Sequence, residues 1–229
     1  MENLMNLKVI AKIHTDFPTK FGIPRQSGLV EELKATIVFE PEYRVADAVR
    51  GLEEFSHIWL VWQFSEAVRE GWSPTVRPPR LGGNKRMGVF ATRSPFRPNA
   101  IGLSSVKLER VELSKDLGPV LHVGGADLMD GTPIYDIKPY LPHVDSHPAA
   151  AGGFAAPLTA YALDVDFPEE LLARVAKDRQ EGLLAVLKQD PRPAYQKDPN
   201  RVYGFPFAGR EIKFTVDDER GLLMVRDVE

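Results

Sequence analysis

The segment His57-Ile-Trp-Leu-Val-Trp-Gln-Phe64 is the most informative part of the chain, because it is an almost unbroken apolar run rich in β-branched and aromatic residues. Such a run is typical of a strand covered on both faces. On the N-terminal side, Leu7 to Ile13 and Ala35 to Phe39 alternate with the period of two that marks a half-buried strand. Three further strands are predicted at Met87 to Thr92, Ile101 to Leu113 and Val120 to Val123.

Between these segments, only Val45 to Leu52 has helical spacing. About six strands in about 140 residues, separated by proline and glycine clusters, favour a closed or rolled antiparallel sheet. The chain has no G-x-G-x-x-G after a strand and no G-x-x-x-x-G-K-[ST], so the usual nucleotide-binding loops are absent. We therefore predict a mainly β protein with a non-Rossmann, antiparallel β-barrel at residues 1–145.

A change of composition follows the predicted barrel. Ser146 to Pro157 is rich in alanine, glycine and proline, which indicates a linker or mobile loop. Beyond it, we predict a small α+β domain at residues 158–229, with a strand from Tyr161 to Phe167 and two helices between Pro168 and Asp190. A terminal hairpin turns at Asp217 to Gly221. Because so small a domain is marginally stable alone, we expect it to pack on the barrel or on a partner subunit.

The composition limits the class of protein. The 229 residues are 43% hydrophobic and 27% charged, which is typical of a globular protein. There is no cysteine, which excludes disulfides, cysteine-ligated metals and cysteine nucleophiles. No run approaches the roughly 18 apolar residues of a membrane span, and Met1 to Lys8 lacks the pattern of a signal peptide. We expect a cytoplasmic protein without membrane contact.

The charge of the chain is unevenly distributed. Gly71 to Leu108 contains no acidic residue, whereas the rest of the chain carries 22 bases against 32 acids. A basic surface of this kind is expected to meet phosphates, in a nucleic acid or in a small cofactor. The alternative is a solvated loop with compensating acids nearby in space. The seven bases, named the basic strip below, are Arg77, Arg80, Lys85, Arg86, Arg93, Arg97 and Lys107.

Metal binding is not expected. His143 and His147 have a spacing of four, but Pro142 and Pro148 bracket them and oppose the helix that would align them as ligands.

Four segments place polar groups on proline-rigidified backbone: Pro24 to Gly28, Arg77 to Asn84, Thr92 to Asn99 and Asp127 to Pro133. A loop that is rigid before its ligand arrives lowers the ordering cost of binding, and sites often lie on such loops. The alternative is that these segments are merely turns. Four of them within one predicted domain favour a binding site.

These segments resemble the TsaA-like methyltransferases, a family represented by the bacterial enzyme that N6-methylates threonylcarbamoyl-adenosine at position 37, next to the tRNA anticodon. The resemblance covers most of residues 5–145 and continues in Asp190-Pro-Arg-Pro-Ala-Tyr195. Ala100 departs from it, since proline is expected after Phe-Arg-Pro-Asn. The matching strings are Phe21-Gly-Ile-Pro-Arg-Gln-Ser-Gly28, Ala46-Asp-Ala-Val-Arg-Gly-Leu-Glu53, Pro74-Thr-Val-Arg-Pro-Pro-Arg-Leu-Gly-Gly-Asn84, Met87-Gly-Val-Phe-Ala-Thr-Arg-Ser94, Phe96-Arg-Pro-Asn99, Asp130-Gly-Thr-Pro133 and Asp136-Ile-Lys-Pro-Tyr140.

The resemblance implies a β-barrel that binds S-adenosylmethionine without a Rossmann sheet, and a homodimer with sites near the subunit interface. It implies cofactor contacts from Pro24, Arg25, Gln26, Phe64, Ser65, Arg93, Leu103, Asp130, Gly131 and Thr132.

The chemistry of methyl transfer suggests further roles. The accepting nitrogen is a poor nucleophile until its proton leaves, and Asp130 or Asp136 could accept that proton. Both aspartates could equally stabilise turns. Trp72 or Phe96 could stack a base of the anticodon loop, although Trp72 could instead be core. Contacts to the tRNA backbone are predicted from Arg77, Arg80, Arg86 and Arg97.

The prediction is an S-adenosylmethionine-dependent tRNA methyltransferase. Two alternatives remain open at this point: a non-catalytic RNA-binding barrel, which the basic strip alone would support, and a methyltransferase for small molecules.

Overall fold

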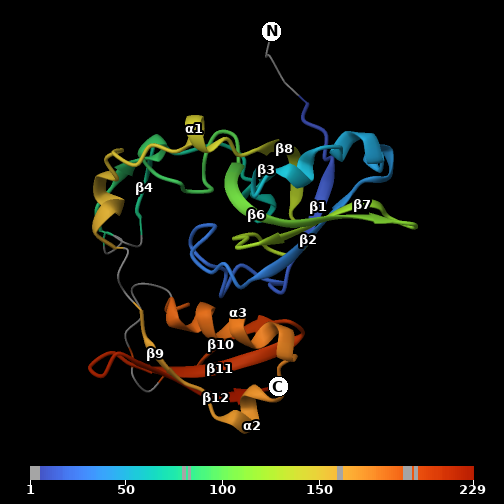
Figure 1. Ribbon diagram of the computed structural model, residues 1–229. Coiled ribbons are helices and arrows are strands. Elements are labelled where there is room, and N and C mark those ends of the chain that lie inside the picture. Colours follow the sequence, from blue (N-terminus) through green and yellow to red (C-terminus); the bar gives the residue numbers. More distant parts are fainter. Residues whose placement is uncertain (1–5, 79–80, 82–83, 159–161, 193–197, 199–200) are drawn as a thin grey trace.

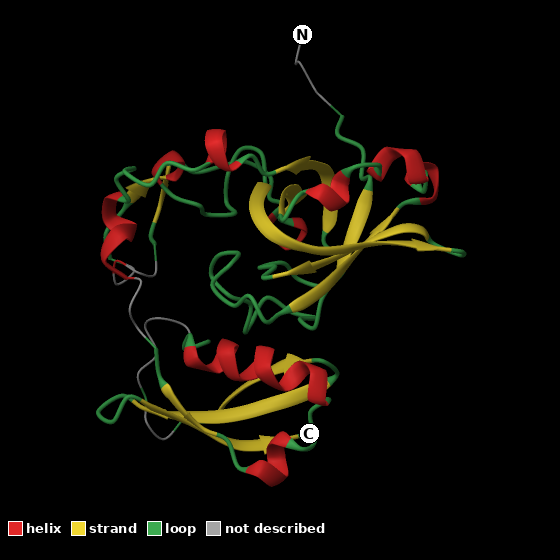
Figure 2. Cartoon of the chain, in the orientation of Figure 1, coloured by secondary structure: helices red, strands yellow, loops and turns green. Residues whose placement is uncertain are grey.

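The computed structural model describes residues 6–78, 81, 84–158, 162–192, 198 and 201–229. It has two parts, a barrel and a smaller α+β domain that carries the C-terminus (Figure 1). Colouring by secondary structure shows that the barrel part is built from strands and short helical turns, whereas the longest helix lies in the smaller domain (Figure 2).

Six antiparallel strands close the barrel, in the order β1-β2-β7-β6-β3-β8. Their alternation places one set of apolar side chains inside, and Ile13, Ile37, Leu60, Leu121 and Ile134 are fully buried there. The predicted antiparallel barrel is therefore confirmed. The strands are β1 (Ala11–His14), β2 (Lys34–Phe39), β3 (His57–Gln63), β6 (Ile101–Ser114), β7 (Gly118–Gly124) and β8 (Pro133–Pro139).

Strand β3 carries the apolar run with which the sequence analysis began. Ile58, Leu60 and Trp62 point into the barrel and are buried. On the outer face, Trp59 is half-buried, packs on Tyr140 and donates a hydrogen bond of 2.9 Å from Nε1 to Asp145 Oδ2. The run is therefore covered on both sides, by the barrel core within and partly by the following chain outside.

Strand β8 was not predicted, although it closes the barrel by pairing with both β1 and β3. Proline begins and ends it, and Asp136 and Lys138 interrupt its apolar pattern. Proline at strand ends costs few ladder hydrogen bonds, so the strand persists where its sequence reads as turns.

Two predicted elements are wrong in type. Met87 to Thr92 is not one strand: β5 (Met87–Gly88) pairs with β4 (Thr75–Val76), and a 3₁₀ turn follows at η6 (Val89–Ala91). Val45 to Leu52 forms two 3₁₀ turns, η2 (Ala46–Val49) and η3 (Leu52–Glu54), instead of one helix. Gly51 separates these turns with a φ of 82°, a left-handed conformation that an α-helix does not contain. Two further turns are η1 (Pro41–Tyr43) and η4 (Ser65–Ala67).

The chain after the barrel contains more structure than predicted. A single helical turn, α1 (Pro142–Asp145), forms despite the flanking prolines, because proline at the first helical position is tolerated. A 3₁₀ turn, η7 (Gly153–Leu158), follows within the predicted linker and extends just past it.

The C-terminal domain is a four-stranded sheet of order β10-β11-β12-β9 with two helices. The two helices and the terminal hairpin were predicted, whereas β10 was not. Tyr161 of the predicted first strand lies outside the described residues. The elements are β9 (Asp164–Asp166), α2 (Glu169–Leu172), α3 (Lys177–Lys188), β10 (Tyr203–Phe207), β11 (Arg210–Asp217) and β12 (Leu222–Val228).

The Asp-Pro-Arg motif after α3 has a structural role in this fold. The buried guanidinium of Arg192 donates hydrogen bonds to the carboxylates of Asp190 and Asp218, at 2.7–3.1 Å. Burial opposes the charge of Arg192, but the two carboxylates outweigh it and raise the pKa of this guanidinium. Residues 193–197, the rest of this motif, lie outside the described residues.

We expect Gly102→Ala to destabilise the barrel by about 1–3 kcal/mol, because the site is overpacked. An added Cβ at Gly102 of β6 would lie 2.3 Å from the ring of Trp62, its partner on β3. The matched control is Gly88→Ala on β5, where an added Cβ meets nothing within 4 Å. Urea unfolding measures both variants, and equal stabilities would contradict this packing argument.

Candidate functional site

An open cavity of about 660 Å³ lies at one end of the barrel. Its lining comes from the end of β3 with η4, the Thr92–Arg97 turn, the start of β6, the β1–β2 segment (residues 15–33) and the Asp127–Thr132 turn. The cavity combines aromatic side chains with polar side chains on short turns, the usual composition of a small-molecule site.

The structure brings eight of the ten predicted cofactor residues into the lining of this cavity. Asp130 and Gly131 do not line it. The eight lining residues are Pro24, Arg25, Gln26, Phe64, Ser65, Arg93, Leu103 and Thr132.

Hydrogen bonds between distant turns fix the cavity wall. Arg93 donates from Nη1 to Gln26 Oε1, which joins the Thr92–Arg97 turn to the β1–β2 segment. Phe64 donates its backbone N–H to Ala100 O at 2.8 Å, and its ring lies 4.2 Å from that of Trp62. These contacts hold the wall together before any ligand binds.

A buried polar chain reaches the cavity from inside the barrel, and the sequence analysis did not assign it. Trp62 donates from Nε1 to Ser104 Oγ at 3.0 Å, and Ser104 donates to Asp127 Oδ1 at 2.6 Å. Burial raises the pKa of the Asp127 carboxyl above its ordinary value. The only sequence signal for Asp127 was its place in the rigid Asp127–Pro133 segment, since Ser104 and Trp62 are distant along the chain.

The two aspartates predicted as proton acceptors have different partners. Asp130 Oδ1 accepts a hydrogen bond of 3.1 Å from Thr15 N and lies 3.2 Å from His14 Nδ1. Asp136, on β8, forms an ion pair with Lys138 at 2.9 Å. Neither aspartate lines the cavity, so their catalytic role stays a prediction.

The four arginines predicted to contact RNA differ in environment. Arg77 and Arg86 are exposed, and no salt bridge joins either to an acid within the described part of the chain. Arg97 is half-buried and donates to Thr92 O at 2.7 Å, so part of its hydrogen-bonding capacity is used within its own turn. Arg80 lies outside the described residues.

The two aromatic side chains predicted to stack a base are both exposed. Trp72 is 54% exposed, which contradicts the alternative that it belongs to the core, and its ring lies 6.0 Å from that of Phe90. Phe96 lines the cavity, is 41% exposed and lies 4.0 Å below the guanidinium carbon of Arg69. An aromatic ring beside a cation is a common surface for a nucleobase next to a phosphate.

The described residues contain neither a membrane-spanning helix nor a group of side chains suited to a metal ion. No helix among them has the length and apolarity needed to cross a membrane. No three acidic, histidine or cysteine side chains gather there in a way that could hold a metal ion.

The fold and the cavity define a ligand-binding β-barrel that lacks a glycine-rich phosphate loop. Comparison with sequence families makes this class specific. The tRNA-methyltransferase O N-terminal domain matches residues 12–146, and the TrmO C-terminal domain matches residues 160–229.

Individual relatives agree with the family match. The tRNA (adenine(37)-N6)-methyltransferase of Escherichia coli strain K12 is 49% identical over 217 residues, which are 91% of this chain and 92% of that protein. A Pseudomonas aeruginosa relative with the provisional name of an S-adenosylmethionine-dependent methyltransferase is 42% identical over 204 residues, 85% of each chain. The crystal structure of TrmO from Pseudomonas aeruginosa superposes with a TM-score of 0.78 at 32% identity, covering 99% of both chains. The chain therefore belongs to the tRNA-methyltransferase O family, as the resemblance predicted.

We expect Asp127→Asn to change the pH dependence of stability. The folded-state pKa of Asp127 is raised, so the unfolded chain ionises first as pH rises. As pH rises from the ordinary aspartate pKa to the raised one, the free energy of unfolding of the wild type therefore falls. The Asp127→Asn variant has no carboxyl at this position and does not show this fall. In urea unfolding from about pH 4 to pH 7, the stability of the variant should therefore increase relative to that of the wild type. A difference that is constant with pH would contradict the buried, ionisable state of Asp127.

Proposed function

We propose that this protein transfers a methyl group from S-adenosylmethionine to N6 of threonylcarbamoyl-adenosine at position 37 of tRNA. The observation that carries the proposal is the meeting of eight predicted cofactor residues in one cavity of a chain from the tRNA-methyltransferase O family. The activity in the name of the Escherichia coli relative supports the same reaction.

The residues of the cavity fit S-adenosylmethionine chemically. Its adenine needs apolar or aromatic surface, which Phe64 and Leu103 offer. Its cationic sulfonium favours carboxylates, and its own carboxylate favours a guanidinium such as that of Arg93. The volume of about 660 Å³ lies within the usual range for a small-molecule site. We propose that the eight lining residues Pro24, Arg25, Gln26, Phe64, Ser65, Arg93, Leu103 and Thr132 hold the cofactor. Asp130 and Gly131 do not line the cavity but directly precede Thr132, and they stay proposed contacts.

Positioning is the main catalytic contribution of this chain. When bound, S-adenosylmethionine supplies a methyl group on a positively charged sulfur. The cavity wall needs to orient that donor toward the accepting nitrogen and exclude water, which can supply a large part of the rate enhancement. Asp130 or Asp136 would accept the N6 proton, with the partner hydrogen bonds described above orienting the carboxylate.

The tRNA is proposed to lie over the basic strip, with its anticodon loop toward the cavity. The exposed Arg77 and Arg86 supply charge for the phosphates, and Trp72 and Phe96 supply stacking surfaces. We further propose a cytoplasmic homodimer without a metal. The exposed apolar side chain of Leu103, at the cavity, is compatible with a subunit contact there.

The test of the proposed function is incubation of purified protein with S-adenosylmethionine and tRNA, followed by mass analysis of the nucleosides. We expect one added methyl group on threonylcarbamoyl-adenosine and none on adenosine of unmodified tRNA. Methyl transfer to a small amine without tRNA would favour the small-molecule alternative, and cofactor-independent tRNA binding without product would favour a binding module. The same assay on Asp130→Asn and Asp136→Asn tests the two candidate proton acceptors.

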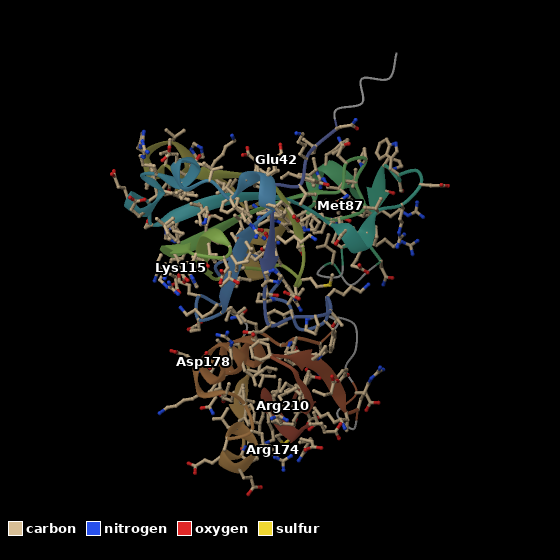
Figure 3. All side chains as sticks on the ribbon, turned by 90° about the vertical axis from the view of Figure 1, so that its right-hand side faces the viewer. Glu42, Met87, Lys115, Arg174, Asp178 and Arg210 are labelled. Atoms are coloured by element: carbon tan, nitrogen blue, oxygen red, sulfur yellow. The ribbon has the colours of Figure 1, made fainter. Side chains whose placement is uncertain are left out.

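We expect Arg77→Ala combined with Arg86→Ala to weaken tRNA binding and to lower its salt dependence by up to about two units of slope, one for each lost phosphate contact. Affinity for S-adenosylmethionine should be unchanged. The charge-matched control combines Lys115→Ala with Arg210→Ala, at two exposed positions of the β6–β7 turn and the C-terminal domain (Figure 3). Binding titrations at several salt concentrations measure the slopes, and an equal loss in both double variants would contradict a defined RNA surface.

A further inference from the structure

The β1–β2 segment connects two strands of the barrel, but its buried apolar side chains pack against the C-terminal domain. Phe17, Val30 and Leu33 are buried in the hydrophobic cluster of the C-terminal domain, together with Leu183 of α3 and Phe205 of β10. They are not part of the cluster inside the barrel. In the ribbon view, this blue segment descends from the barrel toward α3 (Figure 1).

Specific contacts join the start of this segment to the C-terminal domain. The rings of Phe17 and Phe207 meet edge to face with centroids 5.3 Å apart. Ala208 donates its backbone N–H to Asp16 O at 2.9 Å, and Arg179 Nε lies 3.0 Å from Asp16 Oδ2. Arg179 follows Asp178, which lies on the side of the domain that faces the barrel (Figure 3).

A close approach of backbone to a ring lies immediately before residues 23–27 of the cavity wall. Gly22 has a φ of 90°, and an added Cβ there would lie 2.4 Å from the ring of Phe205, which is fully buried. Ile23 packs on the same C-terminal cluster and also lines the cavity. The cavity residues Pro24, Arg25 and Gln26 follow directly. The backbone at Gly22 therefore rests on Phe205 with no space between them.

The other end of this wall is held by the barrel. Gly28 donates its backbone N–H to Gly125 O at 2.9 Å, and Arg93 bonds to Gln26. Residues 23–27 thus span two supports, one from each domain. Loss of either support would leave the wall to be ordered at the moment of binding, at a cost in affinity.

We propose that the C-terminal domain positions the cofactor-binding wall, and that Phe205 is the positioning residue that holds Gly22 and Ile23 in place. This inference rests on the proposed cofactor site. It gives the C-terminal domain a role in ligand binding, although no described residue of that domain lines the cavity.

The experiment is Gly22→Ala, measured in the full chain by calorimetry with S-adenosylmethionine and with its demethylated product. The added methyl group must displace the wall or Phe205, so we expect affinity for both compounds to fall about tenfold or more, because the wall must then be ordered at the moment of binding. The control is Gly51→Ala, which has a similar left-handed φ of 82° but meets nothing within 4 Å. Equal losses in the two variants would overturn the proposal.

A second substitution at Phe205 distinguishes a steric clash with this ring from a general loss of structure in Gly22→Ala. Phe205→Leu removes Cε2, which an added Cβ at position 22 would meet at 2.8 Å, and replaces the planar ring with a smaller side chain that can turn its remaining atoms away. The double variant Gly22→Ala with Phe205→Leu should therefore bind the cofactor more tightly than Gly22→Ala alone, a non-additive result expected of residues in contact. If the effects of the two substitutions simply add, Phe205 is not the support of Gly22. If Gly22→Ala does not fold, Phe205→Leu alone carries the test through weakened cofactor affinity, and unchanged affinity would overturn the proposal.

Hydrogen exchange of residues 23–28 without ligand provides a readout that does not depend on cofactor binding. We expect faster exchange there in Gly22→Ala than in Gly51→Ala. If the wild type shows this wall protected but does not bind S-adenosylmethionine, the proposed function fails while the positioning role stands. If exchange in Gly22→Ala equals that of wild type, the positioning role fails.

Discussion

The pairing of β8 with both β1 and β3 is the constraint on which the site depends. Ile134, fully buried, pairs with Ala11 on one side and with Trp62 on the other. Ile13 donates its backbone N–H to Thr132 O at 3.2 Å, so β1 also binds the turn that precedes β8. Because this turn supplies Asp127 and Thr132 to the cavity, closing the barrel also assembles one side of the site.

Apolar side chains pack together in the interior of the barrel, and the candidate cavity lies at its end. There the core changes from apolar to polar through one chain of hydrogen bonds, from Trp62 to Ser104 and then to Asp127. Gly102 permits this arrangement, since any side chain at that position would collide with the Trp62 ring. A buried polar chain with satisfied members fixes its residues in one arrangement, which is what the proposed positioning of a methyl donor requires.

Local pattern was sufficient for much of the fold but not for its closure. Strands β2, β3, β6 and β7 follow from alternation or from a continuous apolar run, because each packs at least one face into the core. Strand β8 carries charges outside and proline at both ends, so its strand character depends on partners far away in sequence. The helical spacing of Val45 to Leu52 led to the wrong prediction of one helix. The spacing of the apolar side chains fits a helix, but the left-handed backbone at Gly51 interrupts it.

Site residues that lie in the family-like sequence strings were predictable. Residues whose role depends on contacts between distant parts of the chain were not. The strings identified Arg93 and Gln26 as site residues, and the two side chains form a hydrogen bond in the structure. Hydrophobic periodicity and residue spacing did not predict this contact. Asp127 was hidden because its environment comes from Ser104, 23 residues away along the chain. The role of Phe205 was hidden further, because a domain boundary read from composition separates it from Gly22, which it touches.

This shared segment has a thermodynamic consequence for the two domains. The β1–β2 segment contributes Phe17, Val30 and Leu33 to one hydrophobic cluster and Pro24 to Gln26 to the cavity of the other domain. Any ligand that binds the ordered wall more tightly than the disordered one must stabilise the packing beneath it by the same free energy, because linkage is reciprocal. If the wall binds the cofactor as proposed, cofactor affinity and the stability of the C-terminal core are coupled through the same residues, although the domain matches divide the chain between them.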